Sequence, residues 1–108
     1  MAWMSLFLAG VMEIGWPLGL KVSQDPDRRM AGLALAVACM SLSGALLWFA
    51  QKTIPLGTAY AIWTGIGAAG TFVVGVIWFG DSTGVFRILS AFLIIAGVIG
   101  LRLTHPSP

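Results

Sequence analysis

The residue with the most evident chemistry is Glu13, which lies near the middle of a hydrophobic stretch covering residues 3–21. It is the only acidic residue inside any hydrophobic stretch of the chain. A carboxylate at bilayer depth costs about 2.5–3.5 kcal/mol on insertion scales, so it normally faces a protein interior or water. Acids in this setting mark ion pathways and proton relays. Glu13 therefore predicts a site for a proton, a cation, or both.

Three neighbours share the helix face of Glu13, at spacings of three or four residues: Gly10, Trp16 and Pro17. Gly10 is expected to leave open space on this stripe. Pro17 has no N–H for the carbonyl of Glu13, four residues earlier, so this carbonyl is available to a ligand, water or neighbour. The alternative interpretation of Pro17 is an ordinary kink in a membrane helix.

Two aromatic residues, Tyr60 and Trp63, are spaced so that they share one face of a later helix. Aromatic faces attract cations, and more strongly when the cation is desolvated. The alternative is a lipid-interface position, which suits Trp3 and Trp78 at segment ends. Tyr60 and Trp63 lie deeper. Ser43 is a further polar group at depth, although a lone serine often bonds only to its own helix backbone.

The composition identifies the surroundings of these residues. The chain has 58% hydrophobic and 9% charged residues, whereas soluble domains carry about 25% charged residues. This composition indicates a membrane protein. A net charge of +2 is too small for a nucleic-acid footprint. We expect no metal and no cofactor, since no His/Cys cluster occurs and His105 lies in the tail. We expect no enzyme activity, since no nucleophile–base pair is visible.

Four hydrophobic segments must position the candidate residues. They cover residues 3–21, 30–50, 56–79 and 85–103. In lipid every backbone polar group must be bonded internally, so segments of this length are helices. The loops are short, so neighbouring helices run antiparallel and both termini lie on one side. The sequence thus predicts an all-α membrane protein with a single four-helix transmembrane domain over residues 1–108.

Loop charge gives only a small orientation bias. The first and third loops carry Lys21, Arg28, Arg29 and Arg87, and the other side carries Lys52 and Arg102. Loop Lys and Arg residues set topology. The sequence is therefore compatible with insertion in both orientations, or with loops one and three in the cytoplasm and a sister chain of opposite orientation.

Glycines punctuate the third and fourth segments, notably Gly65, Gly67 and Gly97. Glycine permits close helix approach and locally weakens a helix. These residues, with Gly10, are interpreted as packing positions or as a hinge between alternating states. The fourth segment has no ionisable residue at depth, which is typical of a packing or dimerisation helix.

The chain resembles the small multidrug resistance family of transporters over its whole length. The most specific stretch is residues 55–67, PLGTAYAIWTGIG, which follows the family pattern P-x-G-x-A-Y-A-(I/V)-W-x-G-(I/V/L)-G. Glu13 followed by Trp16, and later Leu20-Lys21, resembles the guanidinium-exporter branch. The multidrug branch typically has a small residue or Thr at the position of Trp16, and commonly a Tyr at that of Met40.

The resemblance implies an antiparallel, dual-topology homodimer of four-helix subunits, or a pair with a paralogous sister subunit, in the bacterial inner membrane. Glu13 of both subunits would bind protons and substrate in turn. Trp16, Ser43, Tyr60 and Trp63 would line the pocket, Ser43 being a family serine position. Two departures are Ser90, where the helix-four motif often has Gly, and the loop GDSTG, which replaces a Lys-Glu-Pro type sequence.

The implied activity is proton-coupled antiport that exports guanidinium and small guanidinyl cations by alternating access. A carboxylate matches the forked donors of guanidinium bidentately. Two alternatives stay open. One is a quaternary ammonium or multidrug cation exporter of the same family. The other is a membrane assembly subunit that transports nothing.

Overall fold

The computed structural model describes residues 1–104, so His105 lies outside the described residues. Within them the chain forms α1 (Ala2–Val22), the short 3-10 helix η1 (Pro26–Arg28), α2 (Arg29–Ala50), α3 (Leu56–Phe79) and α4 (Val85–Leu103). Each of the four α-helices is long and apolar enough to cross a membrane. The predicted all-α, four-helix architecture is confirmed, with no strand among the described residues.

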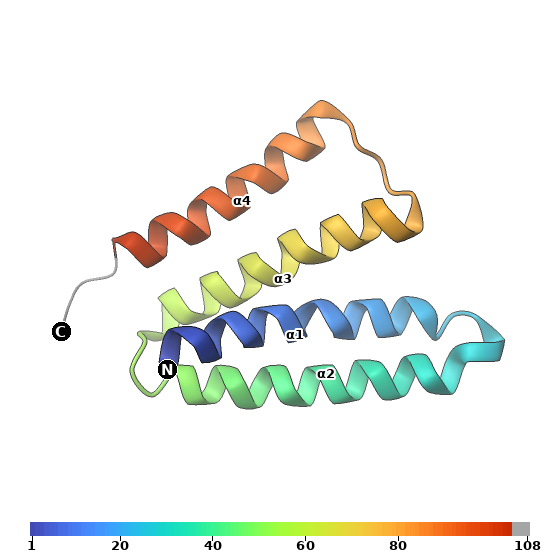
Figure 1. The fold of residues 1–108 in the computed structure, drawn as a ribbon, viewed down its shortest axis with the longest axis horizontal. Helices are drawn as coiled ribbons and strands as arrows, with labels where there is room; N and C mark the ends of the chain where they lie inside the picture. The colour runs from blue at the N-terminus through green and yellow to red at the C-terminus, as the bar shows by residue number, and fades with distance from the viewer. Residues whose placement is uncertain (105–108) are drawn as a thin grey trace.

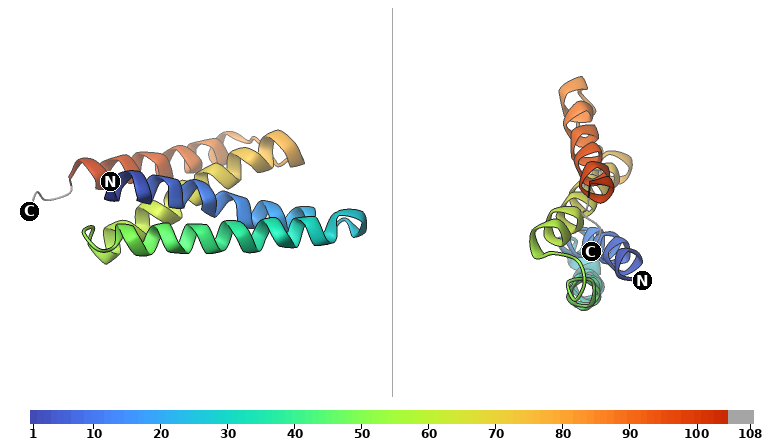
Figure 2. Two further views of the ribbon diagram at one scale, coloured as in Figure 1. Left: turned by 60° about the horizontal axis from the view of Figure 1, so that its bottom comes forward. Right: turned by 90° about the vertical axis from the view of Figure 1, so that its left-hand side faces the viewer.

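The helices lie side by side in the order α2, α1, α3, α4, as Figure 1 shows. The Cα atoms extend 50 × 34 × 16 Å, so the arrangement is thin and open. Figure 2 shows α4 at the outer edge, next to α3. No residue of α4 is buried. One subunit therefore does not surround a central space, and the face around the middle of α1 stays accessible.

Small residues bring α1 and α2 close together. A Cβ atom on Gly19 would lie 2.6 Å from both the Gly32 carbonyl oxygen and the Ala36 amide nitrogen. A larger side chain at these positions would hold the two backbones apart. Small residues at membrane helix interfaces permit such close approach. This contact fixes α1 against α2, while the opposite side of α1 packs on α3. Glu13 on α1 is thereby placed in the centre of the layer.

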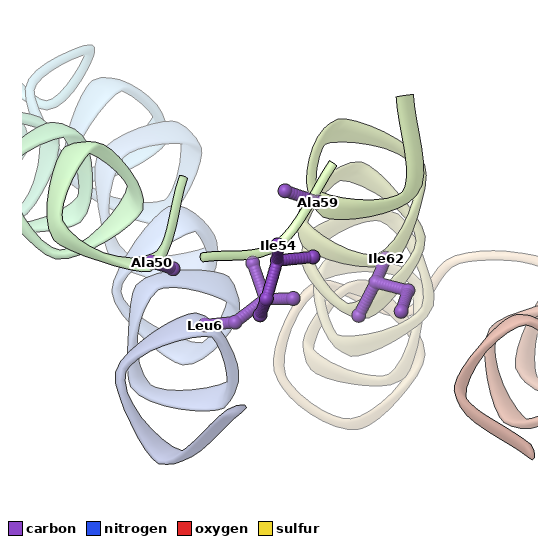
Figure 3. Close-up of a cluster of buried hydrophobic side chains, with 5 residues drawn as sticks. All are labelled: Leu6, Ala50, Ile54, Ala59 and Ile62. Carbon is purple, nitrogen blue, oxygen red and sulfur yellow. The ribbon is translucent and has the colours of Figure 1, made fainter. Parts of the chain in front are cut away.

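A small apolar cluster locks one end of the layer. Figure 3 shows its members, which are Leu6, Ala50, Ile54, Ala59 and Ile62. Leu6 is fully buried. The cluster joins the first turns of α1 to the connection between α2 and α3, so these three helices share a fixed register at this end.

The two loops at the other end are held by local polar contacts. In the first, the Asp25 carboxylate accepts hydrogen bonds from the Asp27 N–H at 3.0 Å and from Arg28 Nε at 3.2 Å. In the second, Gly80 adopts φ 68°, a left-handed conformation that glycine adopts without steric penalty. The turn lets the Asp81 N–H donate to the Gly75 carbonyl at 3.0 Å. Asp81 is thus folded back over the end of α3.

Candidate cation-binding site

The side chain of Glu13 packs against α3 at Gly67. A Cβ atom on Gly67 would overlap Cγ of Glu13 and lie 3.0 Å from its Cβ atom. Gly67 itself is buried, whereas Glu13 is half-buried. The absence of a side chain at Gly67 therefore provides the room for the Cβ and Cγ atoms of Glu13 between the two helices. This acid lies against protein on one side and stays accessible on the other.

The polar neighbour of Glu13 is Trp16, one turn later on α1, whose indole lies near the carboxyl group. An indole is a neutral donor and does not cancel a negative charge. Among residues 1–104, the ion pair within 4.0 Å is Arg28–Asp25, in the first loop. Glu13 therefore has no basic partner in the described part of the chain. A carboxylate in this state is available to a proton or to a mobile cation.

A buried polar bridge joins three helices one turn from Glu13. Ser43 on α2, with 1% of its surface exposed, donates to the carbonyl of Ala9 on α1 at 2.7 Å. Nε1 of Trp63 on α3 donates to the same hydroxyl at 2.7 Å. Ala9 precedes Glu13 by one helical turn, about 5.4 Å along the axis. Ser43 is thus an interhelical bridge, and the interpretation as a serine bonded only to its own helix is wrong.

Tyr60 completes an aromatic pair with Trp63. Their ring centroids are 5.3 Å apart and the rings are tilted by 54°. Tyr60 is 55% exposed, while Trp63 is half-buried. The structure brings these two residues together and fixes the Trp63 ring through its bond to Ser43. The pair therefore offers an exposed aromatic surface that could contact a flat cation.

The glycines differ in what they contact. The expectation that Gly10 leaves open space is wrong, because a Cβ atom there would lie 2.7 Å from Cβ of Ile66. The room next to Glu13 comes from Gly67 instead. Gly65 packs against Val98 of α4, whereas Gly97 has no neighbouring atom within 4 Å. Gly97 is thus not a packing residue within the subunit.

Two partners in this site were not found from the sequence. The carbonyl of Ala9 is a backbone group, and no side-chain pattern identifies it. In the sequence Gly67 is one of several glycines of the third segment, and its pairing with Glu13 depends on how α3 is rotated against α1. The four-residue spacing of Trp63 and Gly67, matching that of Ala9 and Glu13, is the signal that could have found it.

The fold and the site define a class: a small multi-pass membrane protein with one accessible acid at the centre of an open helix layer. Residues 1–94 match the family described as Small Multidrug Resistance protein. The chain belongs to this family of membrane transporters.

Several relatives align over nearly their whole length. The chain is 46% identical to a guanidinium exporter of Proteus vulgaris over 103 residues, covering 95% of this chain and 98% of that protein. It is 48% identical to a guanidinium exporter of Yersinia pseudotuberculosis, with the same coverage. A guanidinium exporter of Salmonella typhimurium is 45% identical over 104 residues, 96% of this chain and 98% of its own length.

Proposed function

We propose that this chain exports guanidinium and small guanidinyl cations in exchange for protons. The observation that carries the proposal is Glu13, whose side chain packs against Gly67 and whose carboxyl group has no basic partner among residues 1–104. Relatives of 45–48% identity over almost the full length carry the name guanidinium exporter. Together they favour a small organic cation as the ligand of this carboxylate.

The surrounding groups suit a flat cation. Guanidinium presents planar, forked N–H donors that a carboxylate accepts bidentately. Trp16 lies near Glu13 on the same helix face. Trp63 and Tyr60 add aromatic surface, which attracts a desolvated cation. In this assignment Glu13 binds the charge, while the aromatic residues and Ser43 shape the pocket.

An antiparallel homodimer would close the site. The subunit is an open layer, so a second copy is needed to cover the accessible side of Glu13. Two copies inserted in opposite orientations provide the inverted halves that many transporters obtain from an internal repeat. The outer helix α4, with no buried residue and with open space at Gly97, offers a surface for such pairing.

Coupling follows from competition for the same carboxylates. A protonated Glu13 cannot pair with a cation, and a cation-bound Glu13 does not hold a proton. If the dimer changes access only when Glu13 is occupied, protons moving down their gradient drive the cation in the opposite direction. This scheme needs no further ionisable group at the membrane centre.

The test is solid-supported-membrane electrophysiology on purified protein in proteoliposomes, with guanidinium and methylguanidinium as substrates. We expect pH-gradient-driven currents from the unmodified protein and from Asp25→Asn, which keeps a capping side chain in the first loop. We expect none from Glu13→Gln. Proton-coupled guanidinium transport by Glu13→Gln would overturn the mechanism.

A quaternary ammonium compound in the same assay tests the second candidate, export of bulkier cations. The exposed face of Tyr60 and the family description favour this candidate. A larger current with the quaternary ammonium than with guanidinium would support it. If no cation gives a current, the interpretation as a non-transporting membrane subunit is favoured.

A further inference from the structure

A separate cavity lies between α1 and α3, toward the α3–α4 loop. Its volume is about 260 Å³, and its lining includes Pro17 and Lys21 from α1, Thr71 and Phe79 from α3, and Asp81 from the loop. It carries an acid, a base, a hydroxyl and an aromatic ring in one small space. No role described so far uses these groups.

The cavity continues the line of the Glu13 site. Facing stripes with four-residue spacing run along the two helices: Glu13, Pro17 and Lys21 on α1, and Gly67, Thr71 and Gly75 on α3. The contact between Glu13 and Gly67 begins this line. The next two turns of each helix line the cavity. Lys21 follows Glu13 by eight residues, about 12 Å along the helix axis, so the cavity lies between the level of Glu13 and the loops, and begins one turn from Glu13 at Pro17.

The acid of the cavity is held in place by the backbone. The left-handed turn at Gly80 folds Asp81 back, and its N–H donates to the Gly75 carbonyl at 3.0 Å. The Asp81 carboxylate then lies against Gly75, where a Cβ atom would overlap Oδ2. A larger residue at position 75 would push this carboxylate out of the cavity. The arrangement aims an exposed acid at the space between the helices.

The base of the cavity does not neutralise this acid. Nζ of Lys21 lies 6.0 Å from the centroid of the Phe79 ring. The ion pair found within 4.0 Å among residues 1–104 is Arg28–Asp25, so Lys21 and Asp81 share the cavity without a close pair. The ring of Phe79 already has a cation near it. The cavity is therefore a place where a small organic cation would find a carboxylate and an aromatic ring, and would compete with Lys21.

We infer that this cavity is an outer site for guanidinium-type cations, in which Asp81 receives the cation before it reaches Glu13. Lys21 acts there as a tethered competitor. The inference rests on the proposed transport function and adds to it a route of access. In an antiparallel pair, the two copies of the cavity would serve the two sides of the membrane.

The experiment measures initial transport rates in proteoliposomes at low and at saturating guanidinium, at low ionic strength. Asp81→Asn is expected to lower kcat/KM by about twofold to fivefold, the range for exposed charge pairs. Lys21→Met is expected to raise kcat/KM by a similar factor. Both effects should disappear at about 1 M salt, where the screening length falls to about 3 Å. The saturated rate and the dissociation constant at equilibrium should stay unchanged.

Asp25→Asn is the matched control, because it removes a loop acid at the same membrane face that does not line the cavity. Wild-type rates at low guanidinium in Asp81→Asn, or equal losses in Asp25→Asn and Asp81→Asn, would overturn the outer site. Neither result affects the proposed function, which is tested separately by the guanidinium current of the unmodified protein and its loss in Glu13→Gln.

Thiol accessibility gives an independent measurement that does not require transport. In a Cys39→Ser background, Thr71→Cys should react with a membrane-impermeant cationic methanethiosulfonate, because Thr71 lines the cavity. Val73→Cys is the control, since Val73 lies at similar depth and is 47% exposed on the outside of the layer. The Asp81→Asn change should slow labelling at position 71. Equal labelling rates at positions 71 and 73 would contradict the inference. An unchanged labelling rate at position 71 in the Asp81→Asn background would also contradict it.

Discussion

The indole N–H of Trp63 donates a hydrogen bond to the hydroxyl of Ser43 at 2.7 Å, and this hydroxyl donates to the carbonyl of Ala9 at the same distance. One hydroxyl thus holds three helices in register beside the half-buried Glu13. The bridge lies one turn from the carboxyl group, so it ties the position of the aromatic ring to the position of the acid.

Removal of this hydroxyl should destabilise the subunit. Ser43→Ala leaves the Trp63 N–H without an acceptor. Interhelical hydrogen bonds in membrane proteins average about 0.6 kcal/mol with a maximum near about 1.7 kcal/mol, so we expect a loss of about 1 kcal/mol. The measurement is SDS unfolding in mixed micelles followed by circular dichroism. Ser41→Ala, on an exposed position of α2, is the control, and an equal loss there would argue against the bridge.

Addition of one methyl group at Gly67 should disable the site. In Gly67→Ala the new Cβ atom would overlap the Glu13 side chain, which must then move. A displacement of about 1 Å in a binding group can reduce function by about 100-fold, so we expect guanidinium transport to fall by at least about tenfold. Gly57→Ala is the control, because a Cβ atom there meets nothing within 4 Å. Normal transport by Gly67→Ala would show that Glu13 is not held as described.

Guanidinium binding should weaken as the pH falls. The protonated form of Glu13 cannot pair with a cation, so each proton displaced on binding changes the dissociation constant by about tenfold per pH unit in the titrating range. The sign is fixed: affinity is highest at high pH and is lost at low pH. Isothermal titration calorimetry in detergent at a series of pH values measures the slope. A slope of zero between about pH 8 and about pH 5 would rule out shared use of the carboxylate.

Bulk on α4 should affect pairing and leave the subunit intact. Gly97→Leu adds a side chain where no atom lies within 4 Å, so helix content should not change. If α4 meets a second copy there, the dimer dissociation constant should rise at least about tenfold, equivalent to about 1.4 kcal/mol. Single-molecule photobleaching in lipid bilayers measures this constant. Gly65→Leu is the contrasting variant, because it clashes with Val98 inside the subunit and should reduce folding itself.

The four helices were predictable because lipid leaves the backbone no alternative. Each hydrophobic segment is long enough to span a bilayer, and its hydrogen bonds must close within the segment. The first helix continues past Pro17 to Val22, so the proline does not end it. Family resemblance at residues 55–67 added the identity of the fold, which the Small Multidrug Resistance match confirms.

The contacts between helices were not predictable in the same way. Spacing places Gly10 and Glu13 on one face, but it does not say which residues of α3 oppose them. Ile66 fills the space at Gly10, and Gly67 opens the space at Glu13. A rotation of α3 by one residue, about 100°, would bring different residues opposite both Gly10 and Glu13. The side-chain volumes at the α1–α3 interface determine how α3 is rotated about its axis. The spacing of residues within one helix does not specify these contacts.

The thinness of the subunit has a consequence for handling it. With Cα atoms spread over only 16 Å in the narrow direction, every helix has one flank against whatever amphiphile surrounds it. Hydrocarbon tails therefore make many of the packing contacts that a buried core makes in a thicker helix bundle. The melting temperature of purified protein should consequently depend strongly on detergent tail length, and reconstitution into a bilayer should raise it.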